Sequence, residues 1–301
     1  MKSPRNKTID LPPEQCGDYL AACLRPTGAL SASAATDQTI CGDFFAVAPL
    51  LPDAAFRLVI ADPPYNLTKT YAGETFYKTD AAAYADFTRR WLAEVRRLLT
   101  PDGSLYVCAD WQTGVILAPL LSDFFTVRSR ITWQREKGRG AAKNWKNCLE
   151  DVWFCTVSDD YYFDLNAVKM RRAVKAPYRE NGEPKDWIQS EAGKTRLTCP
   201  SNFWDDLTVP FWSMPENTAH PTQKPEKLFA KLVLASSAPG DLILDPFAGS
   251  GTTAVVAKKL GRRFTTVEKS ELYCAWTRLR LENAEKDPRI QGYENGEFLK
   301  K

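Results

Sequence analysis

Apolar positions along this chain follow two different periods, and the changes of period mark strands and helices. Short apolar runs of strand length lie at 39–43, 56–61, 104–109, 126–133, 151–157, 242–245 and 264–268. Apolar residues at helical spacing fill 84–99, 112–122, 224–237, 252–260 and 270–284. We expect a turn at 101–103 and an interruption of the second helix near Pro119. Strands that alternate with helices predict an α/β fold with a mostly parallel sheet covered on both faces.

Three segments lack this periodicity and suggest the domain boundaries. Residues 1–37 predict an irregular N-terminal extension, and 285–301 a C-terminal tail. The segment 160–219 is rich in Trp, Pro and charge, and it is too long to be an ordinary connection. We therefore expect an insert with a task of its own between two halves of one domain, 38–159 and 220–284.

Composition narrows the class without deciding it. The chain has 301 residues, of which 44% are hydrophobic and 12% aromatic, enough for one large α/β domain with a smaller insert. The net charge of +3 is too small to indicate nucleic-acid binding by itself. Eight cysteines without C-x-x-C spacing and a single His predict free thiols in a reducing compartment and no metal site. No apolar run reaches membrane-spanning length, so we expect a cytoplasmic protein.

A glycine-containing loop between a strand and a helix, in LILDPFAGSGTTAVVA, predicts a ligand site. A phosphate-binding loop needs Lys after the last Gly, where this chain has Thr252. A dinucleotide loop expects a third Gly, where Ala254 stands. An S-adenosylmethionine loop is the third interpretation, with Glu268 at the next strand end binding the ribose hydroxyls. The pattern alone divides the last two evenly.

The sequence FRLVIADPPYN favours the third interpretation. A strand delivers Asp62-Pro63-Pro64-Tyr65 to the carboxyl edge of the sheet, and two prolines make a stiff turn. Asp62 and the Pro63 carbonyl can each accept an N–H from an aryl amine, which frees the nitrogen lone pair for methylation. If the aryl amine belongs to a nucleic-acid base, Tyr65 can stack on that base, which must first leave the duplex. A purely structural turn is the alternative, and the pairing with the glycine loop weighs against it.

Three motifs in order carry a family resemblance: Asp62-Pro63-Pro64-Tyr65, then 220–225 (HPTQKP), then 245–253 (DPFAGSGTT). They resemble the signature of amino-group DNA methyltransferases, beta group, over roughly residues 38–284. The resemblance implies a class I S-adenosylmethionine-dependent methyltransferase fold, with a seven-stranded sheet in circularly permuted order. It implies catalysis by Asp62, Pro63, Pro64 and Tyr65. It implies cofactor contacts from Asp43, Asp62, Thr222, Gln223, Lys224, Asp245, Pro246, Phe247, Ala248, Gly249, Ser250, Gly251, Thr252 and Glu268.

The expected activity is methylation of N6 of adenine in double-stranded DNA, with target recognition by 160–219. Asp rather than Ser before Pro-Pro-Tyr favours adenine N6 over cytosine N4, which is the first alternative. Methylation of RNA or a protein amide is a second, and a catalytically silent DNA-binding or partner subunit a third. The resemblance implies a bacterial or phage-encoded enzyme in restriction-modification or orphan methylation. Partners implied in such a setting are a second copy of the chain and a cognate restriction endonuclease.

Two locally basic segments predict where DNA phosphates bind. One is 134–147, and the other is 169–185. The residues expected to contact DNA are Arg135, Lys137, Arg139, Lys143, Lys146, Arg171, Arg172 and Lys175. Among Trp145, Trp187, Trp204 and Trp212, one is a candidate to support the flipped base or fill its place in the duplex. His220 is expected to position the turn that follows it, not to act as a catalytic base.

Overall fold

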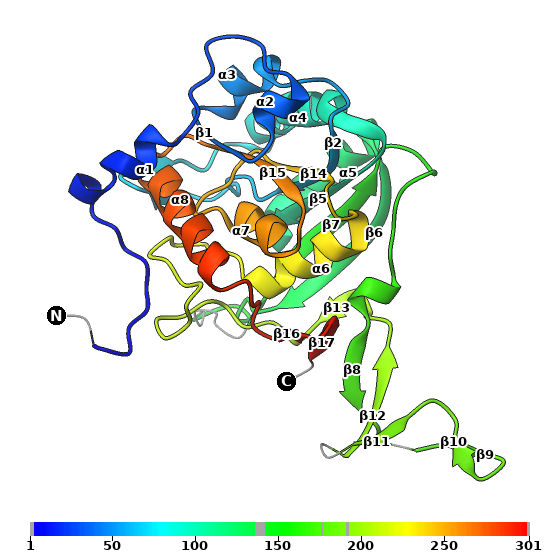
Figure 1. The fold of residues 1–301 in the computed structure, drawn as a ribbon. Coiled ribbons are helices and arrows are strands. Elements are labelled where there is room, and N and C mark those ends of the chain that lie inside the picture. The colour runs from blue at the N-terminus through cyan, green and yellow to red at the C-terminus, as the bar shows by residue number, and fades with distance from the viewer. Residues whose placement is uncertain (1–2, 136–141, 176, 191–192, 300–301) are drawn as a thin grey trace.

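The computed structural model describes residues 3–135, 142–175, 177–190 and 193–299, and its largest element is an eight-stranded sheet (Figure 1). The strand order is β1-β15-β14-β2-β5-β7-β6-β13. All neighbours pair in parallel except β7, which is antiparallel to β5 and β6. The strands are β1 (Gln38–Cys41), β2 (Phe56–Ala61), β5 (Leu99–Ala109), β6 (Thr126–Gln134), β7 (Leu149–Thr156), β13 (Phe203–Trp204), β14 (Leu242–Asp245) and β15 (Arg263–Glu268). The expected mostly parallel sheet is present, and the two-residue β13 extends it by one strand.

The strands of the second half lie in the middle of the sheet, although they come late in the chain. β14 and β15 separate β1 from β2, which precede them by about 200 residues along the sequence. This is the permuted arrangement expected for the domain. It brings the ends of β2, β14 and β15 together at one edge.

Helices cover both faces of the sheet. Successive side chains of each central strand point to opposite faces, so each face presents an apolar surface that a layer of helices buries. Leu58 and Ile60 of β2 belong to a core cluster with α6 (Glu226–Ser236), α7 (Thr252–Lys259) and α8 (Glu271–Lys286). Val59 and Ala61 belong to a second cluster with α3 (Phe44–Val47), α4 (Ala81–Leu98) and α5 (Trp111–Phe124). Figure 1 shows α6, α7 and α8 together on one side of the sheet.

Two local expectations differ from the structure. The helix α5 runs through Pro119 without interruption. The missing N–H of Pro119 would have bonded the carbonyl of Val115, a residue that is 70% exposed, so water can replace that bond. The expected turn at 101–103 lies inside β5, where the pairing with β2 advances from Leu99 to Ser104 through an irregularity.

The segment before β1 contains short helices that lie against the domain. They are η1 (Pro13–Gln15), α1 (Gly17–Ala21) and α2 (Ala32–Ala35). Isolated bridges join Ile9 to Thr218 and Leu24 to Ile40, and the indole of Trp276 donates to the carbonyl of Leu11 at 3.1 Å. The N-terminal segment is therefore tied to both halves of the domain.

A second sheet is built from the expected insert and the end of the chain. Its strand order is β11-β12-β8-β17-β16, with β8 (Met170–Ala173), β11 (Ile188–Ser190), β12 (Gly193–Thr198), β16 (Tyr293–Glu294) and β17 (Glu297–Leu299). Figure 1 shows β8, β12 and β11 projecting away from the large sheet, with the hairpin β9 (Arg179–Glu180) and β10 (Glu183–Pro184) at the far end. The pairing of β17 with β8 joins the expected tail to the insert.

Short elements complete the fold. They are the hairpin β3 (Lys69–Tyr71) and β4 (Glu74–Phe76), and the single turns η2 (Ala48–Leu50) and η3 (Asn166–Val168). Within the described residues, no helix is both long and apolar enough to cross a membrane.

Candidate active site

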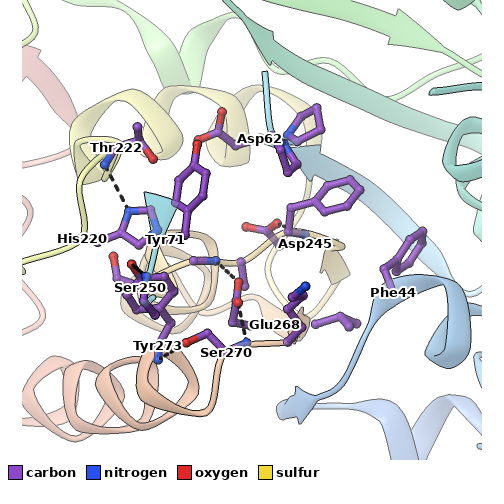
Figure 2. Close-up of a pocket in the computed structure, with 18 of the residues that line it drawn as sticks. Phe44, Asp62, Tyr71, His220, Thr222, Asp245, Ser250, Glu268, Ser270 and Tyr273 are labelled. Atoms are coloured by element: carbon purple, nitrogen blue, oxygen red, sulfur yellow. Dashed lines mark hydrogen bonds between the residues drawn. The ribbon is translucent and has the colours of Figure 1, made fainter. Parts of the chain in front are cut away.

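A cavity of about 710 Å³ lies at the carboxyl ends of β1, β2, β14 and β15. Every residue expected in catalysis or cofactor binding lines it except Gly251. The cavity therefore brings the Asp-Pro-Pro-Tyr turn, the segment after His220 and the glycine loop together from distant parts of the chain. Figure 2 shows side chains from both halves around it, with Asp62 and Glu268 on either side of Asp245. Ligands bind at this edge in open α/β sheets, and a cavity of this size accommodates a nucleoside-sized cofactor.

Two buried carboxylates organise the glycine-loop end of the cavity. Glu268 accepts hydrogen bonds from the amides of Gly249 at 2.9 Å and Ser270 at 2.8 Å. Asp245 accepts from the amide of Phe247 at 3.0 Å and the hydroxyl of Thr253 at 2.5 Å. Burial raises the pKa of each of the two carboxyls to about 7, although these hydrogen bonds lower it. The backbone of the loop is thus held by side chains before any ligand binds.

Both glycines of the loop have positive φ, and an added side chain would meet a different neighbour at each. Gly249 has φ of +50°, and a Cβ there would approach Nε2 of His220 to 3.0 Å. Gly251 has φ of +76°, and a Cβ there would lie 2.8 Å from Cβ of Thr277 and closer still to its hydroxyl and methyl groups. Gly251 precedes α7 and does not line the cavity. It is needed for the approach of α8 to the loop.

His220 and the residues after it form a fixed turn beside the glycine loop. The amide of Thr222 donates to Nδ1 of His220 at 3.3 Å, and the ring lies 4.5 Å from that of Tyr273, centroid to centroid. Burial, with the charges of Lys224, Lys69 and Arg280, lowers the pKa of His220 to about 3. The imidazole is therefore neutral at physiological pH and is held by its neighbours, in keeping with the positioning role expected of it. Gln223 accepts from the amide and hydroxyl of Thr218.

The Asp-Pro-Pro-Tyr turn forms the other end of the cavity. The hydroxyl of Tyr84, on α4, donates to the carbonyl of Pro64 at 2.9 Å and fixes the turn. Oδ2 of Asp62 lies 2.6 Å from Nζ of Lys224, whereas Oδ1 is buried and has no hydrogen-bond partner among the described residues. Burial, followed by the charge of Asp62, raises the pKa of Tyr65, so its ring stays neutral. Nζ of Lys224 lies 5.2 Å from the centroid of that ring.

Glu150 belongs to this end of the site and was not predicted from the sequence. It lies near the start of β7 and is 6% exposed. Oε1 accepts from Arg135 at 2.5 Å, and Oε2 lies 3.6 Å from Nζ of Lys224. Burial alone would lower the pKa of Lys224, but Asp62 and Glu150 outweigh burial and raise it. An acidic residue leading directly into the apolar run of β7 was the available signal.

The residues expected to contact DNA fall in several places. Lys143, Lys146 and Lys175 are exposed, and Arg172 is half-buried. Arg171 donates to both oxygens of Glu297 on β17, at 2.6 and 2.7 Å. Arg135 is engaged by Glu150, and Lys137 and Arg139 lie outside the described residues.

The four candidate tryptophans separate clearly by exposure. Trp145 is 93% exposed and Trp212 is 50% exposed, whereas Trp187 and Trp204 are buried. Trp204 packs in the core cluster that contains Leu58, and Trp187 is covered by Arg179 and Lys194. Trp145 and Trp212 stay candidates for contact with a partner molecule.

This fold and cavity define an α/β enzyme of the methyltransferase type, and comparison with known proteins identifies the family. A family model described as DNA methylase matches residues 56–278. DNA adenine methyltransferase YhdJ of Escherichia coli (strain K12) is 32% identical over 251 residues, covering 81% of this chain and 82% of that protein. Type II methyltransferase M.HpaI of Haemophilus parainfluenzae is 30% identical, covering 82% of this chain and 74% of that protein. The chain belongs to the DNA methylase family.

Solved structures support the fold. PvuII DNA methyltransferase (cytosine-N4-specific) superposes with a TM-score of 0.63 at 19% identity, covering 85% of this chain and 88% of that one. TTHA0409 of Thermus thermophilus, a putative DNA modification methylase complexed with S-adenosyl-L-methionine, gives 0.56 at 23% identity, covering 87% and 96%. The expected family and the class I methyltransferase fold are confirmed.

Proposed function

We propose that the chain transfers a methyl group from S-adenosylmethionine to N6 of adenine in double-stranded DNA. The observation that carries this is the unpartnered Oδ1 of Asp62, in one cavity with the glycine loop. Two relatives at 30% identity or more support it, one named a DNA adenine methyltransferase and the other a type II methyltransferase. Asp before Pro-Pro-Tyr favours adenine, while N4 of cytosine is the alternative, because PvuII methyltransferase shares the fold.

The cavity fits the cofactor by size and by the groups around it. S-adenosylmethionine supplies an electrophilic methyl group on a sulfonium. Gly249 presents backbone without a side chain, and Glu268 at the end of β15 is an acceptor for the ribose hydroxyl groups. Asp43, two residues after β1, lines the same cavity as the proposed contact to the cofactor adenine. Thr222, Gln223, Lys224, Asp245, Pro246, Phe247, Ala248, Ser250 and Thr252 form the remaining proposed contacts. Gly251 acts indirectly, by allowing α8 to pack on the loop.

The turn after β2 activates the target amine. Oδ1 of Asp62 and the carbonyl of Pro63 each accept a hydrogen bond from one N–H of the target amino group. The nitrogen lone pair then leaves conjugation with the ring of the base. Tyr65 stacks on the base after it has left the duplex. The nitrogen gains the methyl group and loses one proton, which Asp62 is placed to accept. His220, neutral and held by its neighbours, takes no part as a base.

DNA contacts come from the second sheet and the segment before β7. Lys143, Lys146, Arg172 and Lys175 bind phosphates. Arg135 and Arg171, which pair with Glu150 and Glu297, stay expected DNA contacts, as do Lys137 and Arg139 outside the described residues. The segment 160–219 reads the target sequence. We place the protein in the cytoplasm of a bacterial cell, where its DNA substrate is, as a homodimer or beside a cognate restriction endonuclease.

Product analysis tests the proposal. The protein is incubated with methyl-labelled cofactor and duplex DNA, the DNA is digested, and the modified nucleoside is identified. We expect N6-methyladenine, and N4-methylcytosine would establish the alternative. Absence of a methylated nucleoside from an enzyme that binds the cofactor and DNA would refute the activity.

The variant Asp62→Ala should lose transfer by at least about 100-fold, because one preorganised hydrogen-bond partner is worth that much. Cofactor affinity, measured by calorimetry, should change less than about threefold. The matched control is Asp123→Ala, which removes an exposed carboxylate of α5 outside the cavity. Near-normal turnover of Asp62→Ala would contradict the mechanism.

A further inference from the structure

Four charged side chains of alternating sign form a row that ends at Asp62. Arg135 donates to Oε1 of Glu150 at 2.5 Å. Oε2 of Glu150 lies 3.6 Å from Nζ of Lys224, which lies 2.6 Å from Oδ2 of Asp62. The side chains of Lys224 and Glu150 are 5% and 7% exposed, and that of Asp62 is 19% exposed. Such a buried row is costly to keep charged, so each member depends on its neighbours.

Other titratable groups face Lys224 from several elements. They are Lys69 on β3, Tyr65 after β2, Tyr71 on β3, Cys108 on β5 and His220. Tyr65, Tyr71, Cys108 and His220 are neutral at physiological pH because burial shifts each pKa toward the uncharged form. The carboxylates of Asp62 and Glu150 are the negative charges that hold the Lys224 ammonium.

Two oxygens of this row lack hydrogen bonds. Oδ1 of Asp62 and Oε2 of Glu150 are buried without a hydrogen-bond partner among the described residues. A buried acceptor left unsatisfied costs about 1–3 kcal/mol, so such atoms mark sites that a ligand or a neighbour completes. The oxygen of Glu150 faces the Lys224 ammonium at ion-pair distance. That of Asp62 is left for the target amino group, which shares Asp62 with the buried Tyr65 hydroxyl, since burial and then Asp62, through its charge and a side-chain hydrogen bond, raise the pKa of Tyr65.

We propose that Glu150 is a positioning residue for methyl transfer. It draws the Lys224 ammonium to one oxygen of Asp62, so that the other oxygen stays free for an N–H of the base. This inference rests on the proposed function, and it adds a residue that the three sequence motifs do not contain.

The flexibility of lysine is the physical reason for the second carboxylate. The ammonium has three donors on a four-carbon stem, and facing Asp62 alone it can bridge both carboxylate oxygens. The backbone of Lys224 is held, since its carbonyl accepts from Thr252 at 3.2 Å, so only the end of the side chain needs guidance. Glu150 supplies that guidance from β7, and Arg135 holds Glu150 in turn.

Nitrogen-15 NMR of the lysine ammonium groups tests the contact without using turnover. The Lys224 signal is the one missing from Lys224→Met. In Glu150→Gln, which keeps the shape and removes the charge, the Lys224 ammonium signal should shift at neutral pH and its protons should exchange faster with water. An unchanged signal and exchange rate would overturn the proposal. This readout does not need methyl transfer, so failure of the proposed function and failure of this inference are distinguishable.

Kinetics test the effect on the reaction. Glu150→Gln should lower kcat at least about tenfold, while KM for DNA and for the cofactor changes less than about threefold, and Glu150→Asp should recover part of the loss. The control Glu282→Gln, at an exposed position of α8 outside the cavity and the second sheet, should match the unmodified enzyme. A kcat of Glu150→Gln within twofold of the unmodified enzyme would overturn the proposal.

A double variant separates positioning from a structural role. With Lys224→Met, Asp62 faces Glu150 without a cation between them, and like charges oppose ionisation of Asp62. Adding Glu150→Gln to that background should cost less activity than it costs alone, or restore some. An equal or larger loss in the two backgrounds would show that Glu150 acts independently of Lys224. Where Lys224→Met turnover is undetectable, the NMR signal and proton exchange of Lys224 in Glu150→Gln decide.

Discussion

The two ends of the cavity hold their carboxylates in opposite ways. At the glycine-loop end, both oxygens of Glu268 and both of Asp245 already accept hydrogen bonds from the protein. At the Asp-Pro-Pro-Tyr end, Asp62 has one oxygen on Lys224 and one without a partner among the described residues. The first end is assembled in advance, and the second is completed by its substrate. The cofactor and the base are both bound and released in every turnover, so the difference lies in which hydrogen bonds the protein makes for itself before they bind.

The largest effect on the preassembled end should come from Gly251→Ala, compared with Gly261→Ala. Both positions have positive φ, +76° and +72°, so both carry left-handed strain of about 1–2 kcal/mol. Only at Gly251 would the new Cβ meet Thr277, while nothing lies within 4 Å of the one at Gly261. Urea unfolding should show Gly251→Ala less stable by a further 1–3 kcal/mol, roughly. Equal losses would mean that packing on α8 does not shape the loop.

A smaller effect should appear in the pH dependence of stability. The pKa of Glu268 is about 7 in the folded protein, above its ordinary value of 4.5, so the folded state binds the proton more tightly. The stabilisation that this tighter proton binding gives the folded state is complete below about pH 4 and is lost as pH rises through about 7. The free energy of unfolding falls by up to about 1.4 kcal/mol per pH unit in that range. Glu268→Gln should therefore have a flatter stability profile than the unmodified protein between pH 5 and 7. Parallel profiles would contradict the assignment, and Glu294→Gln is the exposed control.

The smallest effect concerns the proposed DNA-binding segment before β7, which lies outside the cavity. Lys143→Ala and Lys146→Ala should each weaken DNA binding a few-fold, whatever the sequence. Each should also reduce the slope of log affinity against log salt by about 1, because one phosphate contact is lost. Fluorescence anisotropy with duplex DNA at several salt concentrations measures both. Lys286→Ala, an exposed lysine at the end of α8, is the control, and an identical slope in all four proteins would exclude this segment from the interface.

The parts predictable from the sequence were those with local signals. Strand and helix periods indicated the sheet, and Asp62, Gly249 and Glu268 each stand shortly after a strand or at its end. The strands of 160–219 were not foreseen, because β8 is paired with β17, more than 120 residues away, and short polar strands have no period of their own. Glu150 was missed because its role depends on tertiary contacts with Arg135 and Lys224, which are distant from it in the sequence.

The structure suggests a packing reason for Gly251 that the sequence pattern did not indicate. Gly251 was expected to admit the cofactor, but its close neighbour is Thr277 of α8. A Gly-x-Gly pattern does not distinguish a ligand from a helix as the reason for a missing side chain. That distinction requires the tertiary contact.

The parallel pairing of β17 with β8 has a practical consequence for handling the protein. Glu297 neutralises Arg171, and the carbonyl of Leu299 accepts from the buried Lys227 at 2.7 Å, so these last described residues hold the second sheet against α6. If 160–219 reads the target sequence as proposed, deletion of 297–299 should disturb sequence selectivity before it disturbs methyl transfer itself. Tags are better placed at the opposite terminus.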